Sequence, residues 1–299
     1  MYRGHQAIYI FLQGIECVVS IRTSLSLGAT QPPDKTKMKF SNIKALILDM
    51  DGVLWRDDTP IGDLPAIFGC IQAQGLKVAL ATNNATRTMD EHLEKLSGFG
   101  LTLEPWQIIS SAAAAANVLG KRFPEGGAVF VVGENGIQRA LEERGFKPII
   151  DPADVTTPVA VVSSFDRCVT YQKLSRATLH IRAGAPFYGT NPDKTFPTPE
   201  GLVPGAGAIL ASIEAATDTR PIIIGKPQPT MMFMALENLG ISPEEALVVG
   251  DRLETDIAAG QAAGCKTALV LSGVSTREQS EKWKPNPDFV FDDLSSILA

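Results

Sequence analysis

Cysteine and histidine, which together supply most zinc ligands, are scarce in this sequence. The four cysteines are widely scattered, with no Cys-x-x-Cys pair among Cys17, Cys70, Cys168 and Cys265. The three histidines also lack metal-ligand spacing, and they are His5, His92 and His180. A structural zinc site or a disulfide framework is therefore disfavoured, and each histidine is expected to be a surface or packing residue. A reducing cytoplasm is the expected compartment.

Runs of Lys and Arg are also missing. The formal net charge is -6 and the sequence pI is near 5.2. Such a surface repels phosphate backbones, so nucleic acid is not an expected partner. An anionic substrate would need a local positive centre, such as a metal ion or a buried lysine.

No apolar run is long enough to span a bilayer. The fairly apolar stretch 7–21 is short and is interrupted by Gln13, Gly14 and Glu16. These interruptions also argue against a signal peptide, so we expect no membrane partner. We interpret residues 1–37 as an unmatched, poorly ordered N-terminal extension. Because regular patterning begins soon after Met38, our hypothesis is that Met38 is the true initiator.

The rest of the sequence has the pattern of an α/β protein. The chain has 299 residues, 44% of them apolar, which is enough for a core domain with an insertion. Near-continuous apolar runs predict strands at 43–48, 77–81, 128–132, 159–162, 221–224, 246–249 and 266–271. Amphipathic stretches between them predict helices at 89–96, 111–123, 135–144, 171–182, 231–239 and 255–263. Glycines stand where helix C-caps are expected, at Gly100, Gly145, Gly184, Gly240 and Gly264. This alternation predicts a Rossmann-like parallel sheet with helices on both faces.

Proline-rich segments suggest a second domain. Pro105 opens the middle of the chain, and the segment 191–204, with four prolines, closes it. We therefore expect a smaller α/β domain at 104–202, inserted into a core made of 38–103 and 203–299.

Four polar clusters each follow a predicted strand. They are Asp49-Met-Asp-Gly-Val-Leu, Thr82-Asn-Asn, Gly225-Lys226-Pro and Gly250-Asp251-Arg-Leu-Glu-Thr-Asp256. In open parallel sheets, ligands bind at the carboxyl ends of the strands, where helix N-termini also converge. Four clusters at this edge are hard to explain as loop accidents.

The first cluster places two carboxylates on one face. Asp49 and Asp51 are two residues apart, so in extended chain their side chains leave the same side, and Gly52 permits a sharp turn after them. By itself the motif also fits a polar turn after a strand. An EF-hand calcium loop is excluded, because apolar residues follow Gly52 where further oxygen ligands are required.

Asp251 and Asp256 add more negative charge at the same edge. Several carboxylates gathered there would repel one another, and a hard cation with oxygen ligands resolves the conflict. Magnesium is the usual choice where phosphate completes the coordination. Asp256 alone also fits a first-turn helix acid favoured by the helix dipole.

The other two clusters offer groups for an anion. Lys226 follows an apolar strand, so we expect it to be partly buried, where its charge would stabilise both a phosphate and an aspartate nucleophile. Thr82 and Asn83 offer a hydroxyl, an amide and backbone N–H groups for phosphoryl oxygens. Taken alone, Thr-Asn-Asn is also a turn signal.

Together these motifs resemble the haloacid dehalogenase superfamily. The order and spacing of Asp-x-Asp-Gly-Val-Leu, Thr-Asn-Asn, Gly-Lys-Pro and Gly-Asp-x-x-x-x-Asp are similar to the subgroup of NagD-type and 4-nitrophenyl phosphatases, which carry a large inserted α/β cap. Three further segments resemble this subgroup, namely Thr190-Asn-Pro-Asp193, Pro204-Gly-Ala-Gly207 and Leu271-Ser-Gly-Val274. The resemblance runs from about Lys44 to the C-terminus.

The resemblance implies Mg2+-dependent hydrolysis of small-molecule phosphate monoesters. Asp49 would attack phosphorus and form an aspartyl-phosphate, and Asp51 would act as general acid and then general base. Thr82 and Asn83 would bind phosphoryl oxygens, and Lys226 would hold nucleophile and phosphate together. Related dehalogenases and phosphonatases generally lack the acid that Asp51 provides, which favours an ester substrate.

The resemblance also implies a metal site and a cap. The metal ligands would be Asp49, the backbone carbonyl of Asp51, and Asp251, while Asp256 would help to fix the loop. The cap would choose the substrate, a small phosphorylated metabolite, and similar proteins form homo-oligomers through it. In the cap, a predicted strand-to-helix turn offers Phe165, Asp166, Arg167 and Tyr171 as candidates. A solvated turn explains these four equally well. Trp55, just beyond the first motif, is expected to be a packing residue in preference to a platform for the substrate.

Two rival functions stay open at this point. A phosphotransferase or mutase would pass the phosphoryl group to a sugar instead of water. A non-catalytic sensor would bind a phosphorylated metabolite and a partner protein, although such a sensor needs no nucleophile-plus-acid pair. The motifs do not name the substrate, because cap residues decide it.

Overall fold

The computed structural model describes residues 42–198 and 200–298, without the side chain of Pro197. The expected extension 1–37 and the hypothesis about Met38 lie outside these residues. In the part of the chain that the structure describes, no helix is both long enough and apolar enough to cross a membrane.

The first sheet has six strands, and every neighbouring pair in it is parallel. Their spatial order is β15 (Phe289–Phe291), β14 (Lys266–Val270), β13 (Ala246–Gly250), β1 (Ala45–Leu48), β4 (Lys77–Thr82) and β5 (Ile108–Ser110). The central strand β1 is buried along its whole length, as its apolar sequence predicts.

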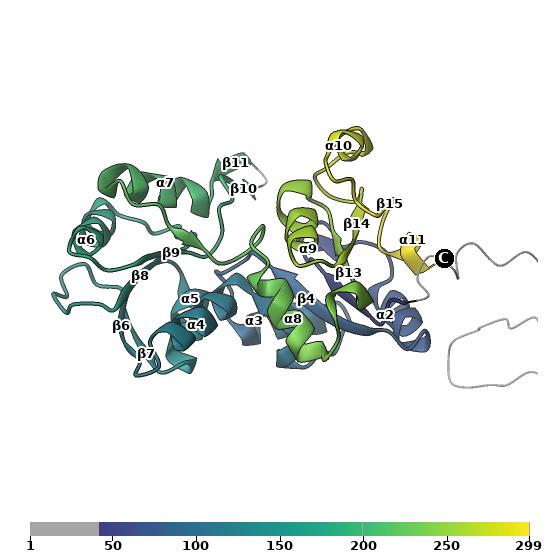
Figure 1. Ribbon diagram of the computed structural model, residues 1–299, viewed down its shortest axis with the longest axis horizontal. Helices are drawn as coiled ribbons and strands as arrows, with labels where there is room; N and C mark the ends of the chain where they lie inside the picture. Colours follow the sequence, from purple (N-terminus) through teal and green to yellow (C-terminus); the bar gives the residue numbers. More distant parts are fainter. Residues whose placement is uncertain (1–41, 199, 299) are drawn as a thin grey trace, which may run out of the picture. The chain divides into compact units, whose positions relative to one another are not determined.

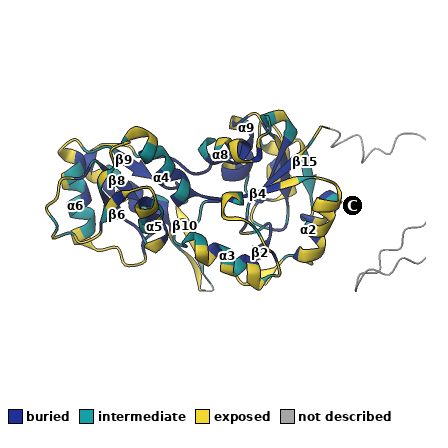
Figure 2. Cartoon of the chain, turned by 90° about the horizontal axis from the view of Figure 1, so that it is seen from below, coloured by how far each residue is buried: buried dark blue, intermediate teal, exposed yellow. Residues whose placement is uncertain are grey.

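Helices cover both faces of this sheet. Figure 2 shows α8 (Thr230–Leu239) and α9 (Ala258–Ala262) on one side of β4, and α2 (Leu64–Ala73) and α3 (Met89–Gly98) on the other. The chain closes with two short helices, α10 (Arg277–Lys282) and α11 (Ser295–Leu298). Helix starts follow local chemistry: at the start of α3, the Thr88 side chain accepts from the Glu91 N–H while the Glu91 carboxylate accepts from the Thr88 N–H.

The second sheet has five parallel strands in the order β12 (Ile222–Ile223), β9 (Phe187–Gly189), β8 (Ala160–Ser163), β6 (Gly127–Val132) and β7 (Phe146–Ile149). Helices α6 (Tyr171–Arg182) and α7 (Ala206–Thr217) cover one face, and α5 (Asn135–Glu143) covers the other (Figure 1). Helix α4 (Ser111–Arg122) packs against both α5 and α8, so one apolar cluster continues from the first sheet to the second.

Two antiparallel hairpins complete the fold. The first joins β2 (Trp55–Arg56) to β3 (Thr59–Pro60), directly after β1. The second joins β10 (Thr195–Thr198) to β11 (Gly201–Pro204), between β9 and α7. Both contribute residues to the cavity described below.

The predicted α/β architecture is confirmed, and all five predicted C-cap glycines have φ between 65° and 101°. The predicted helix 255–263 begins instead as a π-helical turn, η3 (Leu253–Ile257), and continues as α9. The expectation that the strand before Lys226 ends in the core sheet is wrong. That strand, β12, pairs with β9 in the second sheet.

The two sheets also divide the chain differently from the expected insertion at 104–202. Strand β5 lies in the first sheet, although its residues fall inside that range. Strand β12 lies in the second sheet and α7 packs beside α6, although both fall outside that range. The existence of a cap as a separate domain stays a prediction.

Candidate active site

Three neighbouring strand ends place the first residues of the site. Strand β1 lies between β13 and β4, with Leu48 opposite Val249 on one side and Leu80 on the other. The next residue, Asp49, donates its backbone N–H to the Val249 carbonyl at 2.9 Å. Asp49 therefore stands between the segment that follows β13 and the segment that follows β4. This is the predicted carboxyl edge of the parallel sheet.

Two glycines let the backbone close around Asp251. Gly52 has a φ of +88°, and a Cβ there would lie 2.6 Å from Asp251 Oδ2. A Cβ on Gly273 would overlap the same carboxylate. The Asp251 side chain is held from this side by the Val274 N–H, which donates to Oδ2 at 2.8 Å. Its other oxygen, Oδ1, is buried without a hydrogen-bond partner.

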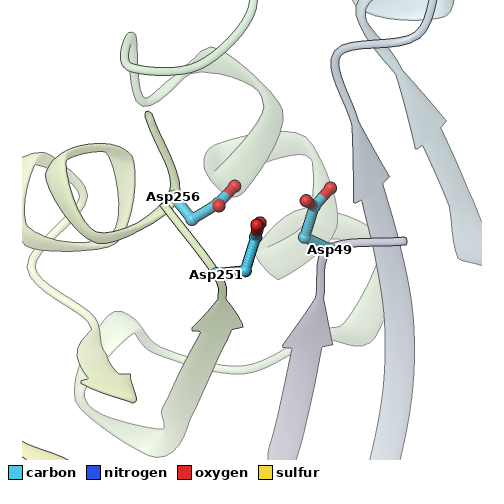
Figure 3. A group of neighbouring side chains, drawn as sticks. All are labelled: Asp49, Asp251 and Asp256. Carbon is cyan, nitrogen blue, oxygen red and sulfur yellow. The ribbon is translucent and has the colours of Figure 1, made fainter. Parts of the chain in front are cut away.

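Three carboxylates converge at this point, as Figure 3 shows. Asp49, Asp251 and Asp256 each offer an oxygen, and these oxygens lie within 4.8 Å of one another. Burial, followed by repulsion from Asp256, raises the pKa of Asp49 well above its ordinary value, against the pull of Lys226. The same two causes raise the pKa of Asp251 to about 7. A cluster with this much unfavourable charge fits a cation with oxygen ligands.

The chain's own cation in the cluster is Lys226, which is 2% exposed. Its Nζ lies 2.7 Å from Asp49 Oδ1, 2.6 Å from Asp256 Oδ1 and 2.8 Å from the Ala81 carbonyl. Burial alone would lower the pKa of Lys226, but attraction to Asp256 and Asp49 outweighs it and raises the pKa above its ordinary value. The lysine is therefore charged and held against the Asp49 carboxylate.

Asp256 differs from Asp49 and Asp251 in the groups that its carboxylate contacts. Its Oδ1 is paired with Lys226, and its Oδ2 accepts from the Arg252 N–H at 3.0 Å. Among the described residues, Asp256 Oδ1 has the ion pair with Lys226 and no further hydrogen bond, whereas Asp251 Oδ1 has neither an ion pair nor a hydrogen bond. This difference fits a metal held by Asp49 and Asp251, with Asp256 fixing the loop and Lys226.

The Asn83 side chain connects the Thr82-Asn-Asn cluster to the Gly225-Lys226-Pro cluster. The Asn83 amide oxygen accepts from the Lys226 N–H at 2.9 Å, and its Nδ2 donates to the Lys226 carbonyl at 3.0 Å and to Asp193 Oδ2 at 3.1 Å. The Asn83 side chain is thus occupied in placing Lys226, and its backbone carbonyl accepts from the Ser111 hydroxyl at 2.8 Å. A phosphoryl oxygen would therefore meet the backbone N–H of Asn83. Thr82 is 1% exposed, and its hydroxyl accepts from the Asn84 N–H at 3.1 Å.

Asp51 differs from the other acids because it is exposed and faces the cavity. Its Oδ1 accepts a hydrogen bond from the Trp55 indole at 2.8 Å. Trp55 is 2% exposed, so the prediction of a packing residue is correct but incomplete. The six predicted core positions, at 49, 51, 82, 226, 251 and 256, thus gather at one edge.

Comparison with known proteins agrees with this geometry. Residues 46–147 match the family model described as haloacid dehalogenase-like hydrolase, and residues 223–297 match a second, HAD-hydrolase-like model. Acid sugar phosphatase from Staphylococcus aureus is 35% identical over 256 residues, covering 86% of this chain and 97% of the relative. The chain belongs to the haloacid dehalogenase-like hydrolase family.

Solved structures place the chain more narrowly in this family. The p-nitrophenyl phosphatase from Archaeoglobus fulgidus is 32% identical with a TM-score of 0.80, covering 86% of this chain and 98% of that one. Glycerol phosphate phosphatase from Mycobacterium tuberculosis, solved with magnesium, is 33% identical with a TM-score of 0.79, covering 86% and 77%. This haloacid dehalogenase-like protein is therefore a phosphatase of the NagD and nitrophenyl phosphatase subgroup.

A cavity of about 790 Å³ in this phosphatase opens onto Asp49 and Asp51. Residues around the second sheet supply part of its wall. Phe165, just after β8, and Phe196, in β10, stack with ring centroids 4.8 Å apart. Asp193 and Asn191 also line the cavity, and the Asn191 amide donates to Asp193 Oδ2 at 2.6 Å.

Of the four predicted cap candidates, only Phe165 lines this cavity. Asp166 is buried and pairs with Lys173 at 2.8 Å. Arg167 pairs with Glu134 and lies along a smaller neighbouring pocket. Tyr171 is 82% exposed at the start of α6 and is not among the residues that line either cavity. Asp166 and Arg167 thus anchor the loop that carries Phe165.

Sequence reasoning missed several lining residues. Phe196 lies in a hairpin that no apolar run in the sequence predicts. Arg87 lies only a few residues after the Thr-Asn-Asn motif. Asp193 had a signal, since Thr190-Asn-Pro-Asp193 resembles a subgroup segment, but the motif did not show that Asp193 contacts Asn83. His92, expected at the surface or in packing, is 3% exposed, and burial lowers its pKa to about 4.

Proposed function

We propose that the protein hydrolyses phosphate monoesters of small molecules in a magnesium-dependent reaction, through an aspartyl-phosphate on Asp49. The observation that carries this proposal is the 2.7 Å contact between the buried Lys226 and Asp49, inside a group of three carboxylates. A lysine held against one carboxylate, beside a site for a second cation, suits the charge of an incoming phosphoryl group.

The first half-reaction transfers the phosphoryl group to the enzyme. An Asp49 oxygen forms a bond to phosphorus while the bond from phosphorus to the ester oxygen breaks, and the electron pair stays on that oxygen. Asp51 gives its proton to the departing oxygen, which leaves as an alcohol. Lys226, Thr82 and the backbone after β4 bind the phosphoryl oxygens.

The second half-reaction regenerates the enzyme. A water oxygen forms a bond to phosphorus, Asp51 takes a proton from that water, and the bond from phosphorus to Asp49 breaks. Inorganic phosphate leaves and Asp49 is again a carboxylate. The same acid thus serves both halves, because the proton that it gives to the departing alcohol is replaced by a proton from the attacking water.

The donor set fits magnesium. Asp49, Asp251 and the backbone carbonyl of Asp51 would hold the ion, and the partnerless Asp251 Oδ1 is the atom that most needs it. When bound, the ion neutralises charge on the phosphoryl oxygens and on the carboxylates. The magnesium present in the glycerol phosphate phosphatase structure supports this choice.

The proposed substrate is a small phosphorylated metabolite. The relatives are named for sugar phosphate, glycerol phosphate and nitrophenyl phosphate, all small esters. The wall formed by Phe165 and Phe196 contacts the part of the substrate beyond the phosphate, so these residues take part in choosing it. A panel of metabolite phosphates, assayed with magnesium, identifies the preferred ester.

The experiment that tests the mechanism replaces Asp51 with asparagine. The amide cannot take a proton from water, so hydrolysis of the aspartyl-phosphate slows, while 4-nitrophenyl phosphate still donates its phosphoryl group without needing an acid. We expect phospho-enzyme to accumulate and steady-state turnover to fall by about 10² to 10⁴-fold. Intact-mass spectrometry after rapid quenching detects the phosphoryl group. The double variant Asp49→Asn with Asp51→Asn must not acquire it. Labelling of that double variant would place the intermediate elsewhere and overturn the proposal.

Magnesium binding is expected to strengthen with pH. Burial and repulsion from Asp256 raise the pKa of Asp251 to about 7, and a carboxyl must lose its proton before it binds a metal. Without metal, the folded protein holds this proton above the pH at which the unfolded chain releases it. Stability of the metal-free protein therefore falls as pH rises from the unfolded value of 3.8 to about 7.

The measurement is the melting temperature with magnesium and with EDTA, on either side of this pH window. We expect magnesium to raise the melting temperature clearly more above neutral pH than near the lower end of the window, at about pH 3.8. Asp251→Asn should lose the rise at both pH values. An equal rise in that variant would contradict the assignment of Asp251 as a ligand.

A further inference from the structure

A buried indole hydrogen-bonds the proposed acid. Trp55 begins β2, four residues after Asp51, and its Nε1–H donates to Asp51 Oδ1 at 2.8 Å. The intervening turn is closed by backbone bonds, with the Gly52 N–H donating to the Trp55 carbonyl at 2.7 Å and the Leu54 N–H to the Met50 carbonyl at 2.8 Å. Among the described residues, the Asp51 side chain has no other hydrogen bond.

The indole is itself held in place by helix α3 and the residue that follows it. The Phe99 ring lies 5.3 Å from the Trp55 ring, and Lys95 Nζ lies 4.8 Å from the Trp55 ring centroid. Lys95 also donates to the Asp57 carbonyl at 2.6 Å, which ties α3 to the hairpin that carries Trp55. A cation above the ring face draws electron density toward it, so the indole N–H becomes a stronger donor.

We infer that Trp55 is a positioning residue, which turns Asp51 so that Oδ2 meets the leaving-group oxygen. This inference rests on the proposed function, in which Asp51 gives and takes the proton. An indole N–H can only donate, so it occupies Oδ1 and leaves Oδ2 for proton transfer. Rotation of a carboxyl about its last bond is otherwise nearly free, and an exposed acid would present its oxygens in many orientations.

The inference predicts a dependence on the leaving group. Alkyl phosphates, such as glycerol phosphate and hexose phosphates, release an alkoxide that needs a proton as it departs. 4-Nitrophenyl phosphate releases a stable anion that does not. In Trp55→Phe we expect kcat/KM for the alkyl esters to fall by about tenfold, and kcat/KM for 4-nitrophenyl phosphate to fall much less. General damage to the site would lower both alike.

Two further proteins separate the hydrogen bond from the packing. Incorporation of 3-benzothienylalanine at position 55 keeps the bicyclic shape and removes only the N–H, so it should reproduce the selective loss. Phe99→Leu is the matched control, because it loosens the packing of Trp55 and keeps the N–H. Because this variant loosens the indole without removing its N–H, we expect its selective loss on alkyl esters to be clearly smaller than that of the benzothienyl protein. A benzothienyl protein with no selective loss, or with one no larger than that of Phe99→Leu, would overturn the inference.

Asp51→Asn distinguishes failure of the inference from failure of the proposed function. If Asp51 is the acid, Asp51→Asn lowers kcat/KM selectively for alkyl esters, because kcat/KM reports the transfer to Asp49 and not the later hydrolysis that all esters share. Adding Trp55→Phe to Asp51→Asn then causes no further selective loss in kcat/KM. If Asp51→Asn shows no such selectivity, the proposed role of Asp51 has failed. If Asp51→Asn is selective and Trp55→Phe is not, only the role of Trp55 has failed.

Discussion

Replacing Asp49 with asparagine is expected to abolish phosphate release, lowering kcat by at least about 10⁴-fold, the scale on which removal of a nucleophile acts in other hydrolases. The amide keeps the shape of the side chain and loses the attacking oxygen, so no aspartyl-phosphate forms. We would measure steady-state hydrolysis of a preferred ester with magnesium, and we would look for phospho-enzyme by intact-mass spectrometry. No phospho-enzyme is expected.

The same variant should stay folded. Asp49 stands among carboxylates that raise its pKa, and Lys226 keeps its 2.6 Å contact with Asp256 after the change. We therefore expect the metal-free melting temperature to be unchanged or higher. Asp63→Asn is the control, because Asp63 caps α2 on the exposed surface and asparagine caps helices equally well. An Asp49→Asn enzyme with near-normal turnover would contradict the assignment of the nucleophile.

The core of the site was predictable because its residues follow apolar strands directly. Asp49 and Asp251 come straight after β1 and β13, and parallel strands bring such residues to one edge. The predicted α/β alternation and the glycine C-caps rest on equally local signals. At these positions the local sequence pattern predicts the same structure that the tertiary fold adopts.

Other features depend on pairings that no local pattern encodes. The two-residue strand β12 has the apolar sequence of another core strand, yet it pairs with β9 in the second sheet. Lys226 still reaches the site, because the chain crosses back to the first sheet and Asn83 holds it at both its N–H and its carbonyl. Strand β5 is three residues long and too short to show a period.

Contacts between side chains were the least predictable. The contact of Asn83 with Asp193 joins residues 110 positions apart, and the stacking of Phe165 on Phe196 joins a loop to a hairpin. Trp55 shows the difference most clearly, since its apolar neighbours predict burial and say nothing about where its N–H points. Burial follows from composition, but the direction of a polar atom follows from the tertiary fold.

Lys226→Met is expected to lower kcat by about 10³-fold, because one of the charges that receives the phosphoryl group is removed. It should also destabilise the metal-free protein by about 3 kcal/mol above neutral pH, since Asp49 and Asp256 lose their shared cation while buried. Lys77→Met is the matched control. Lys77 begins β4, is exposed, and donates to the Leu239 carbonyl away from the site.

The pH dependence of the stability of Lys226→Met shows whether the lost stability comes from the missing charge or from altered packing. Lys226 lowers the pKa of Asp49, so its removal raises that pKa further, and the folded variant retains protons that the unfolded chain releases. The stability deficit against the wild type should therefore be small near the unfolded pKa of 3.8 and grow as pH rises through neutrality. Chemical denaturation with EDTA at several pH values measures it. Methionine nearly fills the volume of lysine, so a packing defect would give a deficit independent of pH, and that result would contradict an electrostatic role for Lys226.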